Sequence, residues 1–184
     1  AYAIRLSLVG SEMCIRDSAR AMGFDNIIGI DIDNSKLDAA HEMGASKTLN
    51  SKSANAVAEL QKYAESRLMA VIDTFGGEST GQLAVRALAK SGQYLLVGQA
   101  GGDFKMPQVW LPQKAITVRG SHVGNSTQLR KLIDMVLAGK VKQMPIERRQ
   151  LSGINQAVED LEKGRVTGRI VFQPDQAKSG PLGG

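Results

Sequence analysis

The chain has 184 residues, 42% apolar and 22% charged, which suits one globular domain, or one domain and part of another, and excludes a disordered chain. Its formal net charge is +5, but the basic residues are scattered and only 4% of the residues are aromatic, so we expect no nucleic-acid partner. The single cysteine, Cys14, and the lack of any apolar run near the roughly 20 residues of a transmembrane helix indicate a cytoplasmic protein with no membrane partner.

Between residues 19 and 120, short apolar strands alternate with helices. We expect one helix to end near Gly23, two others to begin near Asn34 and Ser53, and a further one to lie around Leu83 and end near Gly92. The expected strands are 27–31, 45–49, 68–74, 94–98 and 115–120. The unbroken apolarity of "LMAVIDT" and "YLLVG" is typical of strands covered on both faces. This alternation, with short connections, predicts an α/β fold with a doubly wound parallel sheet.

The chain changes character after residue 120. The expected elements there are an amphipathic helix over 127–138, a strand within 144–151, a helix over 154–161 and a strand over 168–173. The tail over 175–184, after Pro174, is expected to be disordered. The stretch 98–112, which contains glycine and proline, is expected to be the longest loop before the sheet ends.

The apolar strand at 27–31 ends on a carboxylate, Asp31. Ligands of open parallel sheets bind at the carboxyl ends of the strands, where an acid can accept hydrogen bonds from both hydroxyls of an adenosine ribose. Such an acid also repels a 2′-phosphate, because two anions would share one small site, so it selects NAD over NADP. Asp31 can also be only a turn residue, helped by Asp33 and Asn34. Without the surrounding pattern we would favour the turn.

That pattern consists of five stretches over most of the chain: "ARAMGFDNIIGIDIDNSKLDAAHEMGASKTLN", "AVIDTFGG", "GQYLLVG", "VRGSHVGN" and "GRVTGRIVF". From residue 19 to about 174 the chain thereby resembles the nicotinamide-binding half of the medium-chain dehydrogenase/reductase family, especially the zinc-dependent alcohol dehydrogenases. The resemblance implies a Rossmann-type NAD-binding domain over 19–120. It also implies that 121–174 is a C-terminal segment that would complete a catalytic domain missing from this chain.

The resemblance further implies a set of NAD-binding residues, which are Asp31, Lys36, Thr74, Phe75, Val97, Gly98, Gln99, Ser121, Val123 and Arg169. Asp31 would hold the adenosine ribose, and Lys36 would reach the same ribose edge or its phosphate side. Residues 74–75 would lie against the adenosine side and the middle of the dinucleotide. Residues 97–99 would present backbone to the nicotinamide ribose, and Ser121 and Val123 would do so to the carboxamide. Arg169 would approach the pyrophosphate, because a guanidinium suits phosphate oxygens. Lys36 and Arg169 can also be ordinary surface residues.

Residues 1–18 depart from the family pattern. A G-x-G-x-x-G turn should precede Asp31 by roughly 20 residues, which would place its glycines near Ser7, Val9 and Glu12. The chain instead reads "AIRLSLVGSEMCIRDSAR", and Glu12 brings a negative charge to the expected pyrophosphate position. We interpret 1–18 as a non-native segment in the first-strand position, similar to a translated sequencing adapter or a misjoined read. A natural, diverged first strand is the alternative, because "YAIRLSLVG" alternates adequately.

The sequence offers no metal site and no catalytic residue. Cys14, His41 and His122 are far apart and lack ligand spacing. By resemblance, zinc belongs to an N-terminal domain that is absent here, where it would lower the pKa of the alcohol. We therefore expect NAD as the cofactor of this chain, and zinc only in the absent domain.

Three functions remain open. The first is the NAD-binding fragment of a zinc-type alcohol dehydrogenase, which in the complete enzyme converts an alcohol and NAD⁺ to an aldehyde or ketone and NADH. The second is an NADPH-dependent, quinone-reductase-like enzyme, against which Asp31 argues. The third is a folded fragment with no activity of its own, and we expect this chain alone to be inactive. The resemblance also implies a homo-oligomer formed through the sheet edge near 116–119.

Overall fold

The computed structural model describes residues 2–5, 11–42, 44–142, 145–166 and 168–174, with side chains from Ile15 onward. The chain divides into two compact units. The first contains most of the chain as far as residue 143, and the second runs mainly from residue 144. We describe each unit by itself. The tail that we expected to be disordered, 175–184, lies outside the described residues. The domain boundaries proposed above stay predictions.

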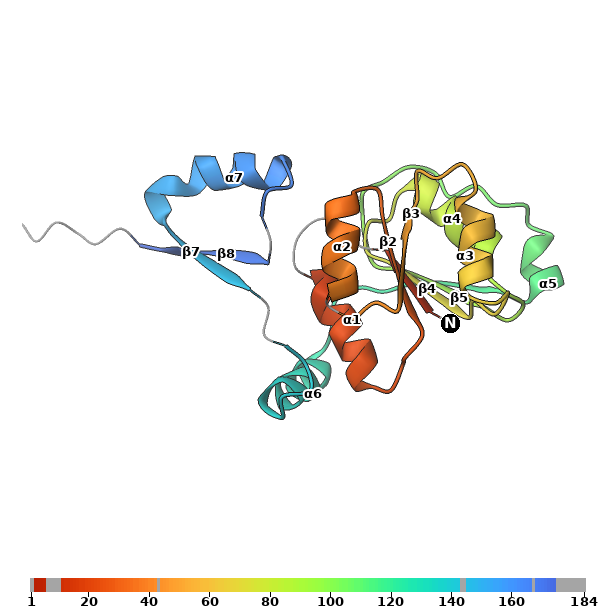
Figure 1. Cartoon of the computed structure of the whole chain (residues 1–184), viewed down its shortest axis with the longest axis horizontal. Helices are drawn as coiled ribbons and strands as arrows, with labels where there is room; N and C mark the ends of the chain where they lie inside the picture. The colour runs from red at the N-terminus through yellow and green to blue at the C-terminus, as the bar shows by residue number, and fades with distance from the viewer. Residues whose placement is uncertain (1, 6–10, 43, 143–144, 167, 175–184) are drawn as a thin grey trace, which may run out of the picture. The chain divides into compact units, whose positions relative to one another are not determined.

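A parallel sheet of six strands forms the centre of the first unit (Figure 1). The strands are β1 (Tyr2–Arg5), β2 (Ile27–Asp31), β3 (Lys47–Asn50), β4 (Ala70–Asp73), β5 (Gln93–Leu96) and β6 (Thr117–Gly120). Their order is β3-β2-β1-β4-β5-β6, with every neighbouring pair parallel. The strand order reverses between β1 and β4, which is the arrangement of a Rossmann-type doubly wound sheet. The predicted fold class is therefore confirmed.

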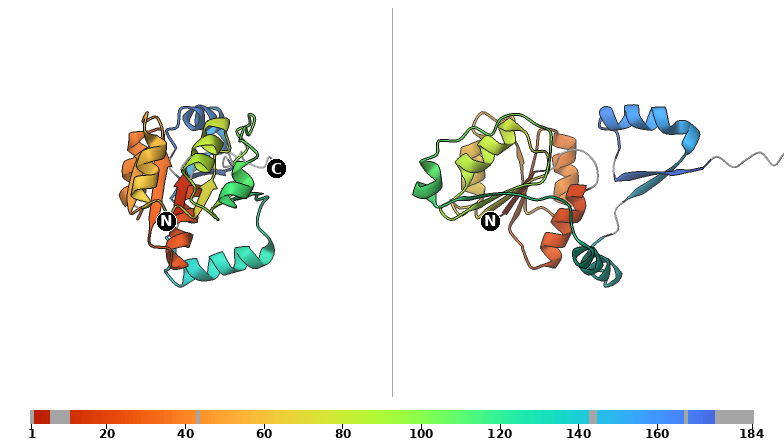
Figure 2. Two further views of the ribbon diagram at one scale, coloured as in Figure 1. Left: turned by 90° about the vertical axis from the view of Figure 1, so that its right-hand side faces the viewer. Right: turned by 180° about the vertical axis from the view of Figure 1, so that it is seen from behind.

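Helices cover both faces of this sheet (Figures 1 and 2). They are α1 (Ser11–Ala21), α2 (Asn34–Glu42), α3 (Ala56–Tyr63), α4 (Glu78–Ala87) and α5 (Trp110–Lys114). A further helix, α6 (Ser126–Leu137), buries none of its residues and lies away from the sheet faces. On one face, Leu60 of α3 and Val85 of α4 pack in a core cluster with Ile28 and Ile30. On the other, Ala40 of α2 packs with Ile27 in a smaller cluster. Strand β2 is buried along its whole length because its alternate side chains enter both cores.

Local hydrogen bonds explain where two of the helices begin. The Thr80 hydroxyl donates to the Gly77 carbonyl at 2.7 Å and accepts from the Gly77 N–H at 3.0 Å, which closes the first turn of α4. Before α6, Asn125 and Gln128 exchange side-chain and backbone hydrogen bonds, both at 2.9 Å. Helix α3 begins at Ala56, not at Ser53 as we expected, because 51–55 form a turn.

One helix was not predicted. Helix α5 ends the stretch that we expected to be a long loop. Trp110 at its start packs against the larger core cluster, and the Lys114 ammonium lies 5.1 Å from the centre of the Trp110 ring. Five residues that include a proline carry too weak a periodicity to indicate a helix, so packing determines this element.

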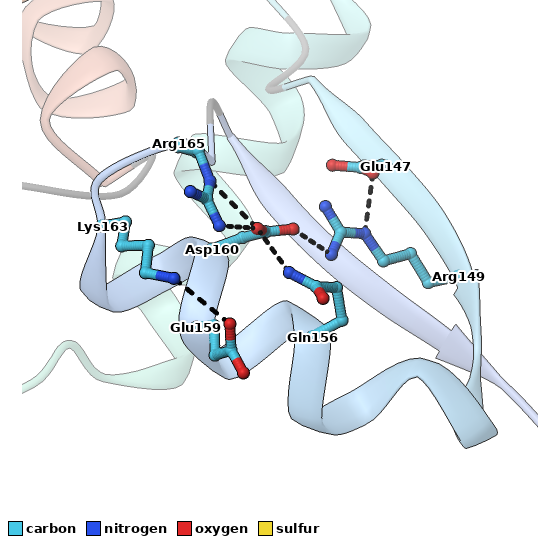
Figure 3. Close-up of polar contacts among 7 residues, drawn as sticks. All are labelled: Glu147, Arg149, Gln156, Glu159, Asp160, Lys163 and Arg165. Atoms are coloured by element: carbon cyan, nitrogen blue, oxygen red, sulfur yellow. Dashed lines mark hydrogen bonds and ion pairs between the residues drawn. The ribbon is translucent and has the colours of Figure 1, made fainter.

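The second unit is a small β-α-β arrangement. Its elements are β7 (Ile146–Gln150), the 3₁₀ turn η1 (Leu151–Gly153), α7 (Ile154–Glu162) and β8 (Arg169–Gln173), with β7 and β8 parallel. Figure 3 shows Asp160 of α7 held by Arg149 at 2.7 Å, by Arg165 at 2.7 Å and by Gln156 at 3.1 Å. The hydrogen bonds from Arg165 and Arg149 lower the pKa of Asp160 from 3.8 to about 2.

Candidate cofactor-binding site

The carboxyl ends of the parallel strands gather most of the predicted site residues at one edge of the sheet. Asp31 ends β2, 74–77 follow β4, 97–101 follow β5, and Ser121 follows β6. We call these residues the carboxyl rim. The strand order reverses between β1 and β4, and ligands of such sheets bind beside that reversal. The rim is therefore the place to look for a cofactor site.

Asp31 is buried at the rim, with 2% of its surface exposed. Its Oδ1 accepts hydrogen bonds from the backbone N–H groups of Ile32 at 2.7 Å and Asp33 at 2.9 Å. Local hydrogen bonds therefore support the turn interpretation of Asp31. The exposed Asp33 makes the next turn by accepting from Ser35, which lowers the pKa of Asp33.

The loops after β4 and β5 touch through their backbones. A Cβ atom placed on Gly98 would lie 2.2 Å from the Phe75 carbonyl carbon, and one on Gly76 would lie 2.1 Å from the Gly98 oxygen. The N–H of Ala100 donates to the Phe75 carbonyl at 2.9 Å, and the N–H of Gly101 donates to the Gly76 carbonyl at 3.2 Å. Two segments predicted to contact different parts of the cofactor, 74–75 and 97–99, are therefore joined directly.

Asp73, which we did not predict, lies beneath this contact. It is 1% exposed, and its Oδ1 accepts from the N–H groups of Phe75 at 3.0 Å and Gly76 at 2.9 Å. Its Oδ2 accepts from the Tyr94 hydroxyl at 2.8 Å. The sequence held one usable signal, because Asp73 ends an apolar strand on an acid just as Asp31 does.

The remaining predicted residues differ in how they are placed. Lys36 lies half-buried on α2, one turn beyond Asp31. The N–H of Ser121 donates to the Leu96 carbonyl at 2.8 Å, so a ligand contact at Ser121 would use its carbonyl or its hydroxyl. Val123 is 82% exposed with φ of 40°. Arg169 begins β8 in the second unit, so its contact with the cofactor stays a prediction.

The first-strand segment forms the elements that a Rossmann-type sheet requires. Residues 2–5 are the central strand β1, paired with β2 and β4, and α1 begins at Ser11. The expected glycine positions near Ser7 and Val9 lie outside the described residues. Glu12 falls in the first turn of α1. The glycine fingerprint is thus absent from the sequence of this segment.

Potential metal ligands are dispersed among the described residues. In that part of the chain, no group of three or more His, Cys, Asp or Glu side chains could hold a metal ion. The described residues therefore do not fit a zinc ion, and we assign none of them a step through zinc. Likewise, no helix within the described ranges is long and apolar enough to cross a membrane.

Comparison with known proteins identifies the family. A zinc-binding dehydrogenase family model matches residues 13–138. The chain belongs to this family. An NAD-dependent alcohol dehydrogenase of Sulfurisphaera tokodaii is 32% identical to this chain over 157 residues. Those residues make up 85% of this chain and 45% of the relative, so the chain spans less than half the length of that relative. The predicted family is thereby confirmed.

Solved structures agree with this family placement. The alcohol dehydrogenase of the archaeon Aeropyrum pernix superimposes with a TM-score of 0.85 at 27% identity, and the match covers 95% of this chain and 50% of the other. A quinone oxidoreductase of Pseudomonas syringae also superimposes, with a TM-score of 0.79 over 94% of this chain and 56% of the other, but at 21% identity. That second likeness concerns the fold alone.

Proposed function

We propose that this chain is the NAD-binding part of a zinc-type alcohol dehydrogenase, whose complete form converts an alcohol and NAD⁺ to an aldehyde or ketone and NADH. The observation that carries the proposal is the carboxyl rim. It has an acid at the end of β2, at the same edge of the sheet as loops 74–77 and 97–101, on the fold of a family whose relative is an NAD-dependent enzyme.

The rim residues fit a dinucleotide in their chemistry. The Asp31 carboxylate suits ribose hydroxyls and repels a 2′-phosphate. The Gly76–Gly98 contact leaves no room for side chains, so the loops offer backbone groups to a ligand. When bound, the nicotinamide supplies the hydride-accepting carbon. This chain's own part is to hold and orient the dinucleotide, with Lys36, Ser121, Val123 and Arg169 as further proposed contacts.

We place the remaining parts of the activity outside this chain. Zinc and the groups that shape the alcohol site belong, in this proposal, to the other half of the family's length. The alcohol is the proposed small-molecule substrate, and the cytoplasm is the proposed location. No residue of this chain is assigned a catalytic role, and the chain by itself is expected to be inactive.

Homo-oligomerisation through the sheet edge belongs to the same proposal. Strand β6 is the last strand of the sheet, it pairs with β5 on one side, and all its residues are exposed. An exposed parallel edge invites pairing with a second chain. Sedimentation of the chain would distinguish a dimer from a monomer, and a Val118→Pro variant, which disrupts ladder pairing at this edge, should shift the chain toward monomer.

The decisive experiment compares NADH and NADPH on the chain and on an Asp31→Asn variant. We expect weak NADH binding, so the titration is best followed by amide chemical shifts at millimolar ligand. Asparagine keeps an oxygen for the two backbone N–H groups and removes the charge. It should reduce the ratio of NADH affinity to NADPH affinity by about tenfold, because it removes a charge–charge repulsion of about 1 to 2 kcal/mol between Asp31 and the 2′-phosphate. Asp33→Asn is the matched control, because it removes a neighbouring exposed charge.

The two alternatives correspond to different results of this titration. Tighter binding of NADPH than of NADH by the unchanged chain would support the quinone-reductase-like alternative. Binding of neither cofactor at millimolar concentration would support the inert fragment. An unchanged preference in Asp31→Asn would remove Asp31 from the site while leaving the family placement intact.

A further inference from the structure

We propose that Asp73 and Tyr94 act as a positioning pair that fixes the spacing of the loops after β4 and β5, and thereby sets how well the carboxyl rim accepts a dinucleotide. The cofactor part of this inference rests on the proposed function. Neither residue is expected to touch the cofactor. Their effect passes through the backbones of residues 74–76 and 97–101.

The Asp73 carboxylate fixes the loop after β4. Its Oδ1 receives the N–H groups of Phe75 and Gly76 at 3.0 and 2.9 Å, in the manner of an Asx turn. The carboxylate thus determines the direction in which the chain leaves the sheet. Because Asp73 is 1% exposed, water cannot easily replace these bonds.

The Asp73 carbonyl joins the second loop to the first. It accepts the N–H of Val97 at 2.9 Å and the N–H of Gly98 at 3.0 Å. Beyond this point, the loops continue side by side, with an isolated parallel bridge between Gly77 and Gly101. One residue therefore contacts both loops at the place where each leaves its strand.

Tyr94 determines the orientation of the carboxylate. It lies on β5 opposite Val71 of β4, 2% exposed, and its hydroxyl reaches the Asp73 Oδ2 at 2.8 Å. The Tyr94 ring stacks on Phe104, with ring centres 5.7 Å apart, so the end of the second loop also rests on this side chain. Gly81 of α4 lies closely below, since a Cβ there would be 2.9 Å from Phe104 and 3.4 Å from the hydroxyl.

These contacts are more than the sheet requires. The β4–β5 ladder is complete without the Tyr94 hydroxyl, and phenylalanine would fill the same buried space. The hydroxyl instead bonds the one carboxylate that holds the loop after β4. Loss of the hydroxyl should therefore loosen the rim before it weakens the sheet, because a buried carboxylate oxygen without its donor turns toward other partners.

The test is a Tyr94→Phe variant of the full 184-residue chain, studied by amide hydrogen exchange without ligand. We expect exchange of the rim amides of Phe75, Gly76, Ala100 and Gly101 to become about tenfold faster or more. The amides of Ser46 and Ser51 bond the carbonyls of Ile27 and Asp31 at 2.9 Å on the other side of the sheet, and should keep their rates.

A Tyr63→Phe variant is the matched control, because it removes a tyrosine hydroxyl on α3, away from the rim. Unchanged rim exchange in Tyr94→Phe would overturn the proposal. An increase shared equally by Ser46 and Ser51 would also overturn it, because it would reveal a general loss of stability.

A second pair of variants keeps the proposal testable if Tyr94→Phe folds poorly. Asp73→Asn retains an oxygen for the two N–H groups, and its amide can donate to the Tyr94 oxygen, so it should keep most of the rim protection. Asp73→Ala loses every side-chain contact and should open the rim. Equal exchange in these two variants would contradict the positioning role.

NADH affinities of the unchanged chain and of the Tyr94→Phe variant distinguish a failure of this inference from a failure of the proposed function. Where the unchanged chain binds NADH, Tyr94→Phe should weaken binding about tenfold and Tyr63→Phe should not. Equal NADH affinity in the chain and in Tyr94→Phe would overturn the inference. If the unchanged chain binds no NADH, the proposed function of this chain fails, while the exchange data still decide whether the pair positions the loops.

Discussion

Substitution of Gly98 by alanine tests the backbone contact that joins the two rim loops. The added Cβ would lie 2.2 Å from the Phe75 carbonyl carbon, 2.3 Å from its oxygen and 2.4 Å from the Thr74 oxygen. All three atoms belong to backbone, so no side chain can rotate away. The loops must separate, which costs about 1 to 3 kcal/mol by comparison with other overpacked sites.

Alanine substitutions at three further glycines distinguish the cost of a steric clash from the cost of an unfavourable backbone conformation. Gly120 has open space and an ordinary φ, so alanine there should be neutral or stabilise by up to about 1 kcal/mol. Gly101 has open space but a φ of +98°, so alanine should cost about 1 to 2 kcal/mol. Gly76 combines a φ of +73° with a Cβ position 2.1 Å from the Gly98 oxygen. Its alanine variant should cost about the sum, roughly 2 to 5 kcal/mol.

The assay is denaturant unfolding followed by the fluorescence of Trp110, the only tryptophan, which lies in the first unit. If the dependence of the free energy of unfolding on denaturant concentration is the same in all variants, then differences between their unfolding midpoints report differences in stability. If Gly98→Ala unfolds within about 0.5 kcal/mol of Gly120→Ala, the close contact is not a constraint and the reasoning fails. The double variant Gly76→Ala/Gly98→Ala should cost less than the sum of the singles, because one separation of the loops relieves both contacts.

Other predictions concern the core, the second unit and the fingerprint. Leu60 is fully buried in the larger core, so Leu60→Ala should lower the free energy of unfolding by about 2 to 5 kcal/mol in the same denaturant assay. Because the pKa of Asp160 is lowered from 3.8 to about 2, its ion pairs stabilise the fold fully above pH 3.8, and this stabilisation is lost as the pH falls toward about 2. In acid unfolding followed by circular dichroism, the Asp160→Asn variant should lack this decrease in stability between pH 3.8 and about 2. Replacing Ser7, Val9 and Glu12 together by glycine should tighten NADH binding about tenfold or more, because the Glu12 charge leaves the expected pyrophosphate position; equal affinity by calorimetry would refute the fingerprint interpretation.

The fold could be predicted from the sequence because its signals are short and local. A strand buried on both faces is mostly apolar, and the run Ile27–Ile30 makes up all of the fully buried β2 except the terminal Asp31. Alternation of such strands with helices leaves few topologies, since crossovers between parallel strands are right-handed. The observed strand order follows from that rule and the family resemblance.

The site was predicted less completely, because part of it depends on contacts that span the chain. The bond from the Tyr94 hydroxyl to Asp73 joins residues 21 positions apart, and no local pattern indicates it. The Gly76–Gly98 contact is similar, because each glycine alone is consistent with an ordinary turn. Helix α5 was missed for the same reason, since the packing of Trp110 is a tertiary contact. The residues named from the resemblance stay predictions until a ligand is titrated.

The first-strand segment illustrates that strand pairing and phosphate binding place different requirements on the sequence. A central strand needs only an extended backbone whose N–H and C=O groups pair on both sides, and residues 2–5 provide this against β2 and β4. Phosphate binding is more demanding, because it needs glycines where the backbone turns and no anion at the start of the helix. In α1, Arg16 is 1% and Asp17 9% exposed, and buried charges of this kind are unusual on the inner face of a helix. A segment that satisfies the pairing but not the turn should leave the sheet intact while weakening the cofactor site, which is why restored glycines should improve affinity more than stability.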